Sequence, residues 1–363
     1  MTIAYSGDNI TFPDASTQNT AAKVGMVNRI INGAMVIDQR NAGASVSTPA
    51  NYSLDRWKLR YSAGTCTVQR STTAPAGFNN SFQLTVGTAR IVVSGDRFGI
   101  EQPIEGFNVA DFGWGTANAQ PVTLSFWVRS SLTGTFGLCF SNFSRGYAAT
   151  YTINAANTYE YKTVTIAGDT SGTWDTTSGT GVLVVFDLGM GSDVRTTTGS
   201  WQAGTFLGAT GATNVVSTSG ATFYITGVQL EKGSTATSFD YRPYGTELAL
   251  CQRYFEKSYN IDTAVGSSIT AGQVAYMSTI STTNQLWGSS IFFKVTKRAT
   301  PTMAGWSYSG NSGQWHYGSA GSSEALGTII FYAPSMSVVV PYMTGVPAGQ
   351  NTAYGHYTAS AEL

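Results

Sequence analysis

Charged residues are scarce in this chain of 363 residues. Asp, Glu, Lys and Arg make up 11% of it, with 20 acidic residues against 20 basic ones, whereas about a quarter is usual in globular domains. No basic run is present. The sequence therefore lacks the electrostatic footprint of a protein that binds nucleic acid or an anionic membrane surface.

Cysteine and long hydrophobic runs are scarce as well. Cys66, Cys139 and Cys251 are scattered without paired spacing, so we expect buried free thiols and neither a disulfide framework nor a zinc site. The longest apolar runs, GVLVVFDLGM and MSVVVPYM, are too short to cross a bilayer. The first residues lack the basic start and apolar core of a secretory signal. We therefore expect folding in a reducing cytoplasm, without membrane insertion.

Glycine, hydroxyl residues and aromatics take the place of charge. The chain has 41 Gly, 19 Tyr, 18 Phe and 8 Trp, a composition typical of all-β proteins with many turns. Several short segments alternate, with these apolar residues on one face: Phe82, Leu84, Val86, Leu124, Phe126, Val128, Phe136, Leu138, Phe140, Val164 and Ile166. The run GVLVVFDLG is apolar on both faces, as a central strand would be. These patterns predict a two-sheet antiparallel sandwich.

One short helix interrupts this β pattern. Pro243 and Gly245 punctuate the end of the sandwich, and ELALCQRYFEK follows. We expect Thr246 as N-cap, Glu247 in the first turn, and Lys257 in the last. The apolar side of this helix would carry three residues: Leu248, Cys251 and Phe255.

The chain therefore divides into four parts. Residues 1–26 are polar and without periodicity, which predicts an arm that orders only on a partner, or a loose terminus. Residues 27–245 form the sandwich, 246–259 a connector helix, and 260–363 a second, smaller β-sandwich. The basic TKRATP stretch in that last part, with Lys294 nearby, is typical of a solvated edge.

Several motifs resemble bacteriophage tail-fibre and virion structural proteins. They are NRIINGAMVIDQR, YSLDRW, TLSFWVRSSLTGTFG, AGDTSGTW and GVQLEKGSTATSFDYRPYGTELALCQRY, and they span residues 27–259. The positions that carry the first two are Asn28, Asn32, Gly33, Met35, Gln39, Arg40, Asp55, Arg56 and Trp57. The resemblance implies a non-enzymatic tail fibre or receptor-binding appendage of the virion. It also implies a trimer whose N-terminal arm contacts other virion proteins and whose last domain meets a host glycan or other receptor.

The same segments are more distantly similar to carbohydrate-binding modules of the jelly-roll kind. Such modules hold a structural calcium with carboxylates near both ends of the domain. Val36 and Gly227 stand at the matching positions here. Because calcium needs several hard oxygen ligands, we expect no metal, and no cofactor is indicated.

Residues for catalysis are few. His316 and His356 have no nucleophile elbow beside them, and we expect both to be surface or packing residues. Glu101, Glu105 and Asp111 lie in GIEQPIEGFNVADFG, which we interpret as a loop with solvated acids, although paired acids could cleave a glycan.

The aromatic stretch MAGWSYSGNSGQWHYGS is the candidate ligand-binding surface. It supplies Trp306, Tyr308, Trp315 and Tyr317 among small polar residues, a composition suited to sugar recognition. The alternative is that Trp306 and Trp315 are core residues. Trp114, Trp174 and Trp201 are weaker candidates of the same kind, because sandwiches often bury tryptophans.

Three other functions stay open. A purely structural virion component, such as a head fibre, decoration or baseplate protein, would bury both tryptophans of the last domain. A glycan-degrading enzyme with a binding module would gather acids in one cleft. A secreted bacterial carbohydrate-binding protein is disfavoured by the lack of a signal sequence and of the calcium carboxylates.

Overall fold

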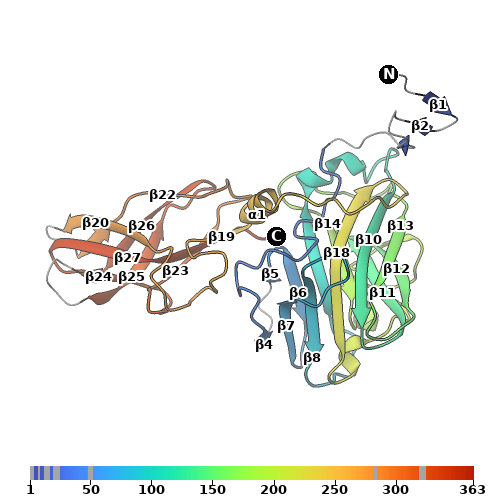
Figure 1. Ribbon diagram of the computed structural model, residues 1–363, viewed down its shortest axis with the longest axis horizontal. Helices are drawn as coiled ribbons and strands as arrows, with labels where there is room; N and C mark the ends of the chain where they lie inside the picture. Colours follow the sequence, from blue (N-terminus) through green and yellow to red (C-terminus); the bar gives the residue numbers. More distant parts are fainter. Residues whose placement is uncertain are drawn as a thin grey trace.

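The computed structural model describes residues 4–6, 9–11, 17–18, 25–47, 52–280, 284–318 and 324–363. Figure 1 shows a large β-domain and a smaller, elongated one whose strands run across those of the first. Helix α1 (Tyr244–Gln252) and the C-terminal residue lie between them. The predicted all-β class is confirmed.

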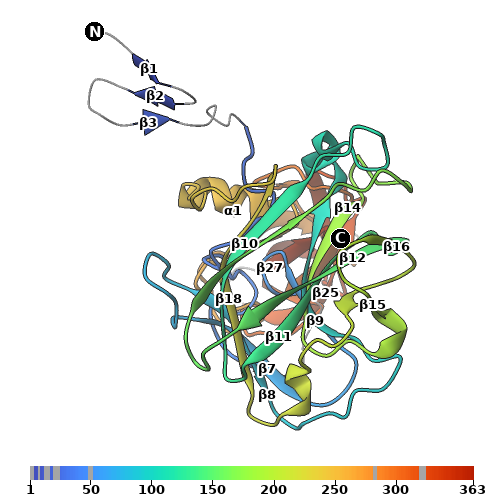
Figure 2. The same cartoon turned by 90° about the vertical axis from the view of Figure 1, so that its right-hand side faces the viewer.

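The N-terminal segment forms a small sheet of its own. Strands β1 (Ala4–Ser6), β2 (Asn9–Thr11) and β3 (Thr17–Gln18) pair in that order, antiparallel. Regular structure here was not expected from the polar, aperiodic sequence. Figures 1 and 2 both show this sheet standing apart from the large domain.

The large domain is a sandwich of two antiparallel sheets. One has six strands, in the order β13 (Glu160–Ile166), β10 (Val122–Ser130), β18 (Thr222–Lys232), β8 (Ser81–Val86), β7 (Cys66–Ser71) and β4 (Val46–Ser47). The other has seven, in the order β16 (Trp201–Ala203), β12 (Arg145–Ile153), β11 (Gly134–Ser141), β14 (Thr180–Asp187), β9 (Phe98–Glu105), β6 (Trp57–Tyr61) and β5 (Tyr52–Leu54).

The core between the sheets follows the predicted alternation. Phe82, Phe126 and Phe136, with their alternating neighbours, are buried in a single cluster, since successive strand residues point to opposite faces. Strand β14 is central in its sheet, as its unbroken apolar run predicted. Its second face is covered by the segment after it, which contains the 3₁₀ helix η3 (Ser192–Val194) and the two-stranded β15 (Arg195–Thr196) and β17 (Gly208–Ala209).

Three tryptophans close one end of this core. The rings of Trp114, Trp174 and Trp201 pack edge to face, with centroids 4.8 to 5.2 Å apart. Each indole nitrogen donates to a backbone carbonyl. Trp114 and Trp174 are buried and Trp201 is half-buried, so the trio closes the core and offers no open stacking face. The 3₁₀ turns η1 (Gly106–Asn108) and η2 (Ala110–Phe112) precede it, and η4 (Val215–Ser217) precedes β18.

The connector helix differs from the sequence prediction at both ends. It begins at Tyr244 after Pro243, so Thr246 lies inside the first turn and is not the N-cap. It ends at Gln252, because Phe255 and Lys257 belong to strand β19 (Phe255–Lys257), which pairs with the last strand of the chain. Tertiary strand pairing therefore overrides the helix propensity of that sequence. Glu247 lies in the first turn as expected.

The small domain is built around one long strand, β27 (Gly349–Ser360). Beside it lie β19, β20 (Val274–Ile280), β23 (Thr302–Trp306) and β24 (Gln314–Gly318). The network continues through β25 (Ala325–Tyr332) and β26 (Val338–Thr344) to β21 (Gln285–Trp287) and β22 (Ile291–Phe292). Trp315, Leu286 and Met343 are central in its own hydrophobic core.

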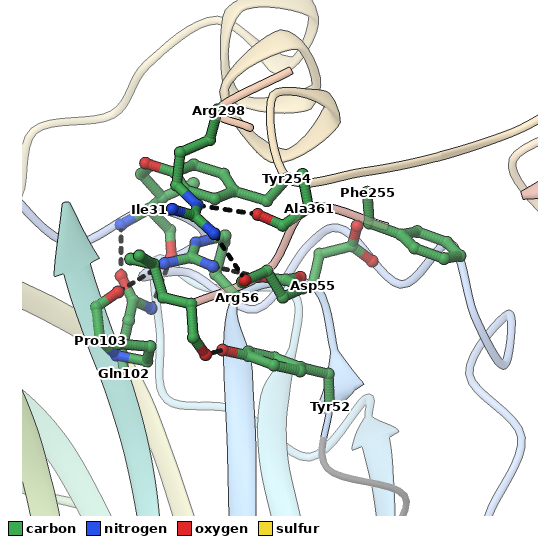
Figure 3. Close-up of polar contacts among 12 residues, drawn as sticks. Ile31, Tyr52, Asp55, Arg56, Gln102, Pro103, Tyr254, Phe255, Arg298 and Ala361 are labelled. Carbon is green, nitrogen blue, oxygen red and sulfur yellow. Dashed lines mark hydrogen bonds and ion pairs between the residues drawn. The ribbon is translucent and has the colours of Figure 1, made fainter. Parts of the chain in front are cut away.

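A network of hydrogen bonds and ion pairs joins the two domains (Figure 3). Arg56, buried in the sandwich, pairs with Glu362 at the end of the chain. Tyr52 donates to the carbonyl of Leu363 at 2.6 Å. Arg298 of the small domain donates to the carbonyls of Ala361 and Glu362, both at 2.9 Å. The last residues therefore fasten the small domain to the large one.

Apart from α1 and the four 3₁₀ turns, the described part of the chain contains no helical element. Within the part of the chain that the structure describes, no helix combines the length and the hydrophobicity that a bilayer crossing requires.

Candidate functional site

The four predicted ligand-binding aromatics do not form one surface. Trp315 is fully buried, and its indole nitrogen donates to the carbonyl of His356 at 2.8 Å. Tyr317 packs against the same core. Tyr308 instead stacks on His316, with ring centroids 3.8 Å apart. The prediction is wrong for Trp315, because alternation along β24 sends it inward, away from the Tyr308 side.

Trp306, the fourth candidate, is half-buried at the end of β23. Both histidines are packing residues, as expected. His356 is fully buried and stacks on Tyr259 at 3.7 Å, and burial lowers the pKa of both His316 and His356.

Two of the three acids considered for catalysis are not solvated loop residues. Glu101 and Glu105 lie on β9 and are buried, so that interpretation is wrong for both. Glu101 accepts two hydrogen bonds from Arg60, at 2.8 and 3.0 Å, and Glu105 is bound by Arg253. Asp111 is exposed, and its carboxylate pairs with the side chain of Arg29 at 3.0 Å.

The basic TKRATP stretch is likewise not a solvated edge. Lys297 has no exposed surface and pairs with the equally buried Glu256 at 2.5 Å. The cysteines are buried free thiols, as predicted. No group of three or more potential metal ligands gathers among the described residues.

A different set of aromatics forms an open groove beside the six-stranded sheet. Phe78, from the loop between β7 and β8, meets Phe239 and Tyr241, from the segment between β18 and α1. Their ring centroids lie 4.8 to 5.4 Å apart. The Tyr241 hydroxyl donates to the carbonyl of Gly77, which ties the two segments together. We call these three rings the aromatic ridge.

Gly227, on β18, leaves the space that the Phe78 ring of this ridge occupies. Its φ is +59°, a region that favours glycine, and it lies within a register irregularity between β10 and β18, where the pairing passes from Gln229 to Thr226. A Cβ atom here would lie 2.6 Å from the Phe78 ring. The absence of a side chain at this position therefore lets the ridge approach the sheet. Val36, the other position without the expected calcium carboxylate, packs beside α1.

Two hollows flank the ridge, and all three ridge residues line both of them. The first, of about 240 Å³, lies toward α1 and also contacts Asn28, Gly33, Ala34, Val36, Gly77, Asn79, Asp240, Arg242, Tyr244 and Glu247. The second, of about 230 Å³, lies over the sheet and also contacts Ser125, Trp127, Tyr161, Gly227, Thr237 and Ser238.

The groove exposes rings along its whole length. Tyr244 is 51% exposed at one end, Tyr241 58% in the middle and Tyr161 46% at the other end. Trp127 packs on Tyr161 with ring centroids 5.5 Å apart. Aromatic faces therefore alternate with two hollows in which small polar groups are available.

Buried polar groups hold the groove in place. Glu231 accepts hydrogen bonds from the backbone and hydroxyl of Thr237, at 2.7 and 2.9 Å, and Gln229 accepts one from the backbone of Asp240 at 2.8 Å. Arg242 donates to the carbonyl of Asn28 and pairs with Glu247. The segment that carries the ridge is thus pre-formed, which lowers the entropic cost of binding.

The groove has little free charge. Arg242 pairs with the carboxylates of both Asp240 and Glu247. Burial raises the pKa of Tyr241 and of Tyr244, so both phenols are neutral near pH 7. Such a site can stack flat apolar faces and exchange hydrogen bonds with hydroxyl groups.

Two short aromatic segments in the sequence are the local signal for this groove. FDYRPY places three aromatics beside Pro243, and GFNN places Phe78 in a turn. Their convergence depends on sequence separations of more than 150 residues, which no local pattern reports.

No family model matches the chain, and no curated protein matches it. Among solved structures, it is similar to the enzymatically active domain of tailspike protein 4 of bacteriophage CBA120, with a TM-score of 0.29 and 13% identity over 57% of this chain. The matched part spans 21% of that tailspike chain.

Carbohydrate-binding modules are also among the similar structures. TmCBM61 in complex with β-1,4-galactotriose has a TM-score of 0.28 and 9% identity, over 56% of this chain and 98% of that one. The family 11 module from Clostridium thermocellum, in complex with a mixed-linked tetrasaccharide, has 0.26 and 11%, over 54% and 98%. These TM-scores all lie below 0.5.

Proposed function

We propose that this chain is a glycan-binding, non-catalytic component of a bacteriophage virion appendage, a tail fibre or receptor-binding protein. The observation that carries the binding role is the exposed, pre-formed groove on either side of the ridge of Phe78, Phe239 and Tyr241. Its ligand would be a saccharide of the host surface.

The chemistry of the groove suits a saccharide. Pyranose rings present apolar C–H faces to aromatic rings and hydroxyl groups to polar side chains. Tyr and Trp supply contact area at low entropic cost, and Ser and Asn supply adaptable hydrogen bonds. The paired charges of the groove favour an uncharged or weakly charged ligand.

The absence of catalysis is part of the proposal. Glycoside cleavage needs two carboxyl groups free to act on one bond. The buried carboxylates Glu101 and Glu105 are instead engaged by Arg60 and Arg253, which supports a binding role.

The virion setting is supported by the tail-fibre-like motifs of residues 27–259. In this setting the N-terminal sheet would contact other virion proteins, the chain would form a homo-oligomer, in particular a trimer, and the small domain would point away from the attachment point. A purely structural role in the virion would leave the groove without a ligand.

The test is binding of the purified full chain to candidate host cells, with intact phage as competitor, followed by titration with surface glycans. Saturable binding that phage displaces, and that Tyr241→Ala weakens about tenfold or more, supports the proposal. Phe143→Ala, which removes a ring that is 41% exposed next to the other sheet, is the matched control. Displaceable binding of unchanged strength by Tyr241→Ala would show that the groove is not the binding site. No cell binding at all by the folded protein would contradict a receptor-binding role and favour a purely structural role in the virion.

A further inference from the structure

The small domain has almost no charge. From residue 263 to residue 361 only Lys294, Lys297, Arg298 and Glu324 are charged. Lys294 and Lys297 contact the β19 segment, and Arg298 binds the end of the chain. The Glu324 carboxylate accepts a hydrogen bond from Tyr308. The face formed by β25, β26 and β21 therefore has no charged side chain of its own.

Three aromatic rings gather on that face. Trp287 and Tyr342 are directly opposite each other on β21 and β26, and their rings stack with centroids 4.4 Å apart at 20°. Tyr332, at the end of β25, meets Trp287 edge to face, at 5.4 Å and 82°. The indole nitrogen of Trp287 donates to Gln285 at 3.3 Å, which helps to fix the ring.

The exposed rings form a corner. Trp287 is 42% exposed and Tyr332 is 56% exposed, and the two ring planes are nearly perpendicular. Neither the Tyr332 nor the Tyr342 hydroxyl has a hydrogen-bond partner among the described residues. Gln285, Thr328 and Thr344 pair in register beside them, so polar groups border the rings. We call this cluster the aromatic corner.

We infer that the aromatic corner of Trp287, Tyr332 and Tyr342 is a second saccharide-binding site, specific for uncharged sugars. One ring plane would receive the apolar face of a pyranose, and the perpendicular plane would contact its edge. The two phenols would exchange hydrogen bonds with sugar hydroxyl groups. A uronate or sialic acid would find no cation on this face to pair with its carboxylate.

A sugar fits this corner better than an apolar protein surface. Covering the two phenols with aliphatic side chains would leave their hydroxyls without hydrogen-bond partners, which is costly in a buried interface, whereas a saccharide supplies both donors and acceptors. The site is independent of the groove in the large domain, because no residue is shared. Because the polar contacts of Figure 3 fasten the two domains together, the two sites would engage one polymer at a fixed separation, which raises avidity.

The test uses affinity electrophoresis of the full chain through gels that contain dextran, galactan, mannan or polygalacturonate. Tyr241→Ala inactivates the groove, Trp287→Ala the corner, and the double variant both. The inference expects Trp287→Ala to weaken retention by at least one neutral polysaccharide about tenfold, both alone and in the Tyr241→Ala background. Tyr332→Phe, which removes only the hydroxyl, should weaken it less. Phe292→Ala, on the same domain and 75% exposed, is the matched control and should change nothing.

Several results would overturn the inference. Retention of Trp287→Ala equal to wild type on every neutral gel would do so, and so would the absence of any retention of wild type. Tighter retention on polygalacturonate than on all three neutral polymers would contradict the specificity. A change in sedimentation of Trp287→Ala without a change in retention would identify the corner as an interface between copies. Thermal melting of Trp287→Phe, which keeps a ring at the position, checks folding. Loss with Trp287→Ala but none with Tyr241→Ala would overturn the groove and leave the corner.

Discussion

Glu105 accepts two hydrogen bonds from the guanidinium group of Arg253, from Nε at 2.9 Å and from Nη2 at 2.5 Å. Glu105 ends β9 of the sandwich, while Arg253 follows α1 and lies 148 residues further along the chain. Tyr254 donates to the same carboxylate at 2.6 Å. This carboxylate, together with Arg56 and Glu362, therefore holds the two domains together.

Substitution of Glu105 should loosen this joint. The carboxylate is 1% exposed, and Arg253 is 30% exposed, so Glu105→Gln leaves a partly buried guanidinium without its counter-charge. We expect an apparent loss of about 2 kcal/mol in unfolding free energy, somewhat below the cost of breaking a fully buried pair. Chemical denaturation measures it. Asp111→Asn, at an exposed pair with Arg29, is the control and should cost under about 1 kcal/mol. Equal effects of the two substitutions would contradict the assignment.

Two glycines should respond in opposite directions to alanine. Gly227→Ala places a Cβ 2.6 Å from Phe78 at a φ of +59°, so it should destabilise the protein by about 1–3 kcal/mol and weaken binding in the groove. Gly245 lies in the first turn of α1 with open space around it, so Gly245→Ala should stabilise the protein by about 0.5–1 kcal/mol. Thermal unfolding of both variants, with glycan titration, checks this. If Gly227→Ala changed neither the stability nor the glycan binding, the ridge would be free to shift away from the sheet.

Lys257 should make stability depend on pH. Burial lowers its pKa to about 8 from an ordinary 10.5, although the carboxylates of Asp55 and Asp38 oppose the shift. Between these two values the unfolded chain binds more protons than the folded one, so stability rises with pH, by at most about 1.4 kcal/mol per unit. The unfolding free energy of wild type minus that of Lys257→Met should therefore increase from pH 7.5 to pH 9.5.

The measurement must stop below pH 10. Burial raises the pKa of the Cys66 thiol to about 11 and that of Tyr52 to about 12, so above about pH 9 the unfolded thiol, and above pH 10 the unfolded tyrosine, ionises first and lowers the stability of both proteins. Urea denaturation at three pH values for both proteins gives the curve. A flat difference across this window would show that Lys257 keeps an ordinary pKa.

Trp315 and Trp306 should differ in their effects on stability. Trp315 is fully buried in the core of the small domain, so Trp315→Ala should cost about 3–5 kcal/mol. Trp306 is half-buried, and Trp306→Ala should cost about 1 kcal/mol. Denaturation followed by the remaining tryptophans checks both. If Trp315→Ala changed the unfolding free energy only slightly, Trp315 would not be a core residue and would again be a candidate ligand contact.

The sequence by itself determined the class of the fold and the inward faces of many strands. Alternation is local, since each residue of a strand points opposite to the next, so Phe82, Phe126 and Phe136 could be placed without knowing their partners. The continuous apolar run of β14 identified a central strand for the same reason. The tail-fibre-like motifs added the virion setting, which stays a prediction.

Only the tertiary structure decided the sites. Whether Trp315 or its neighbour His316 points into the core of the small domain depends on which side of β24 meets that core, and the period of two is the same in either case. Phe255 does not belong to the expected helix, because it lies on β19 and pairs with β27. The groove and the joint unite residues from segments far apart: Phe78 with Tyr241, and Glu105 with Arg253. Local sequence patterns carry no information about such long-range convergence, because packing of the whole chain creates it.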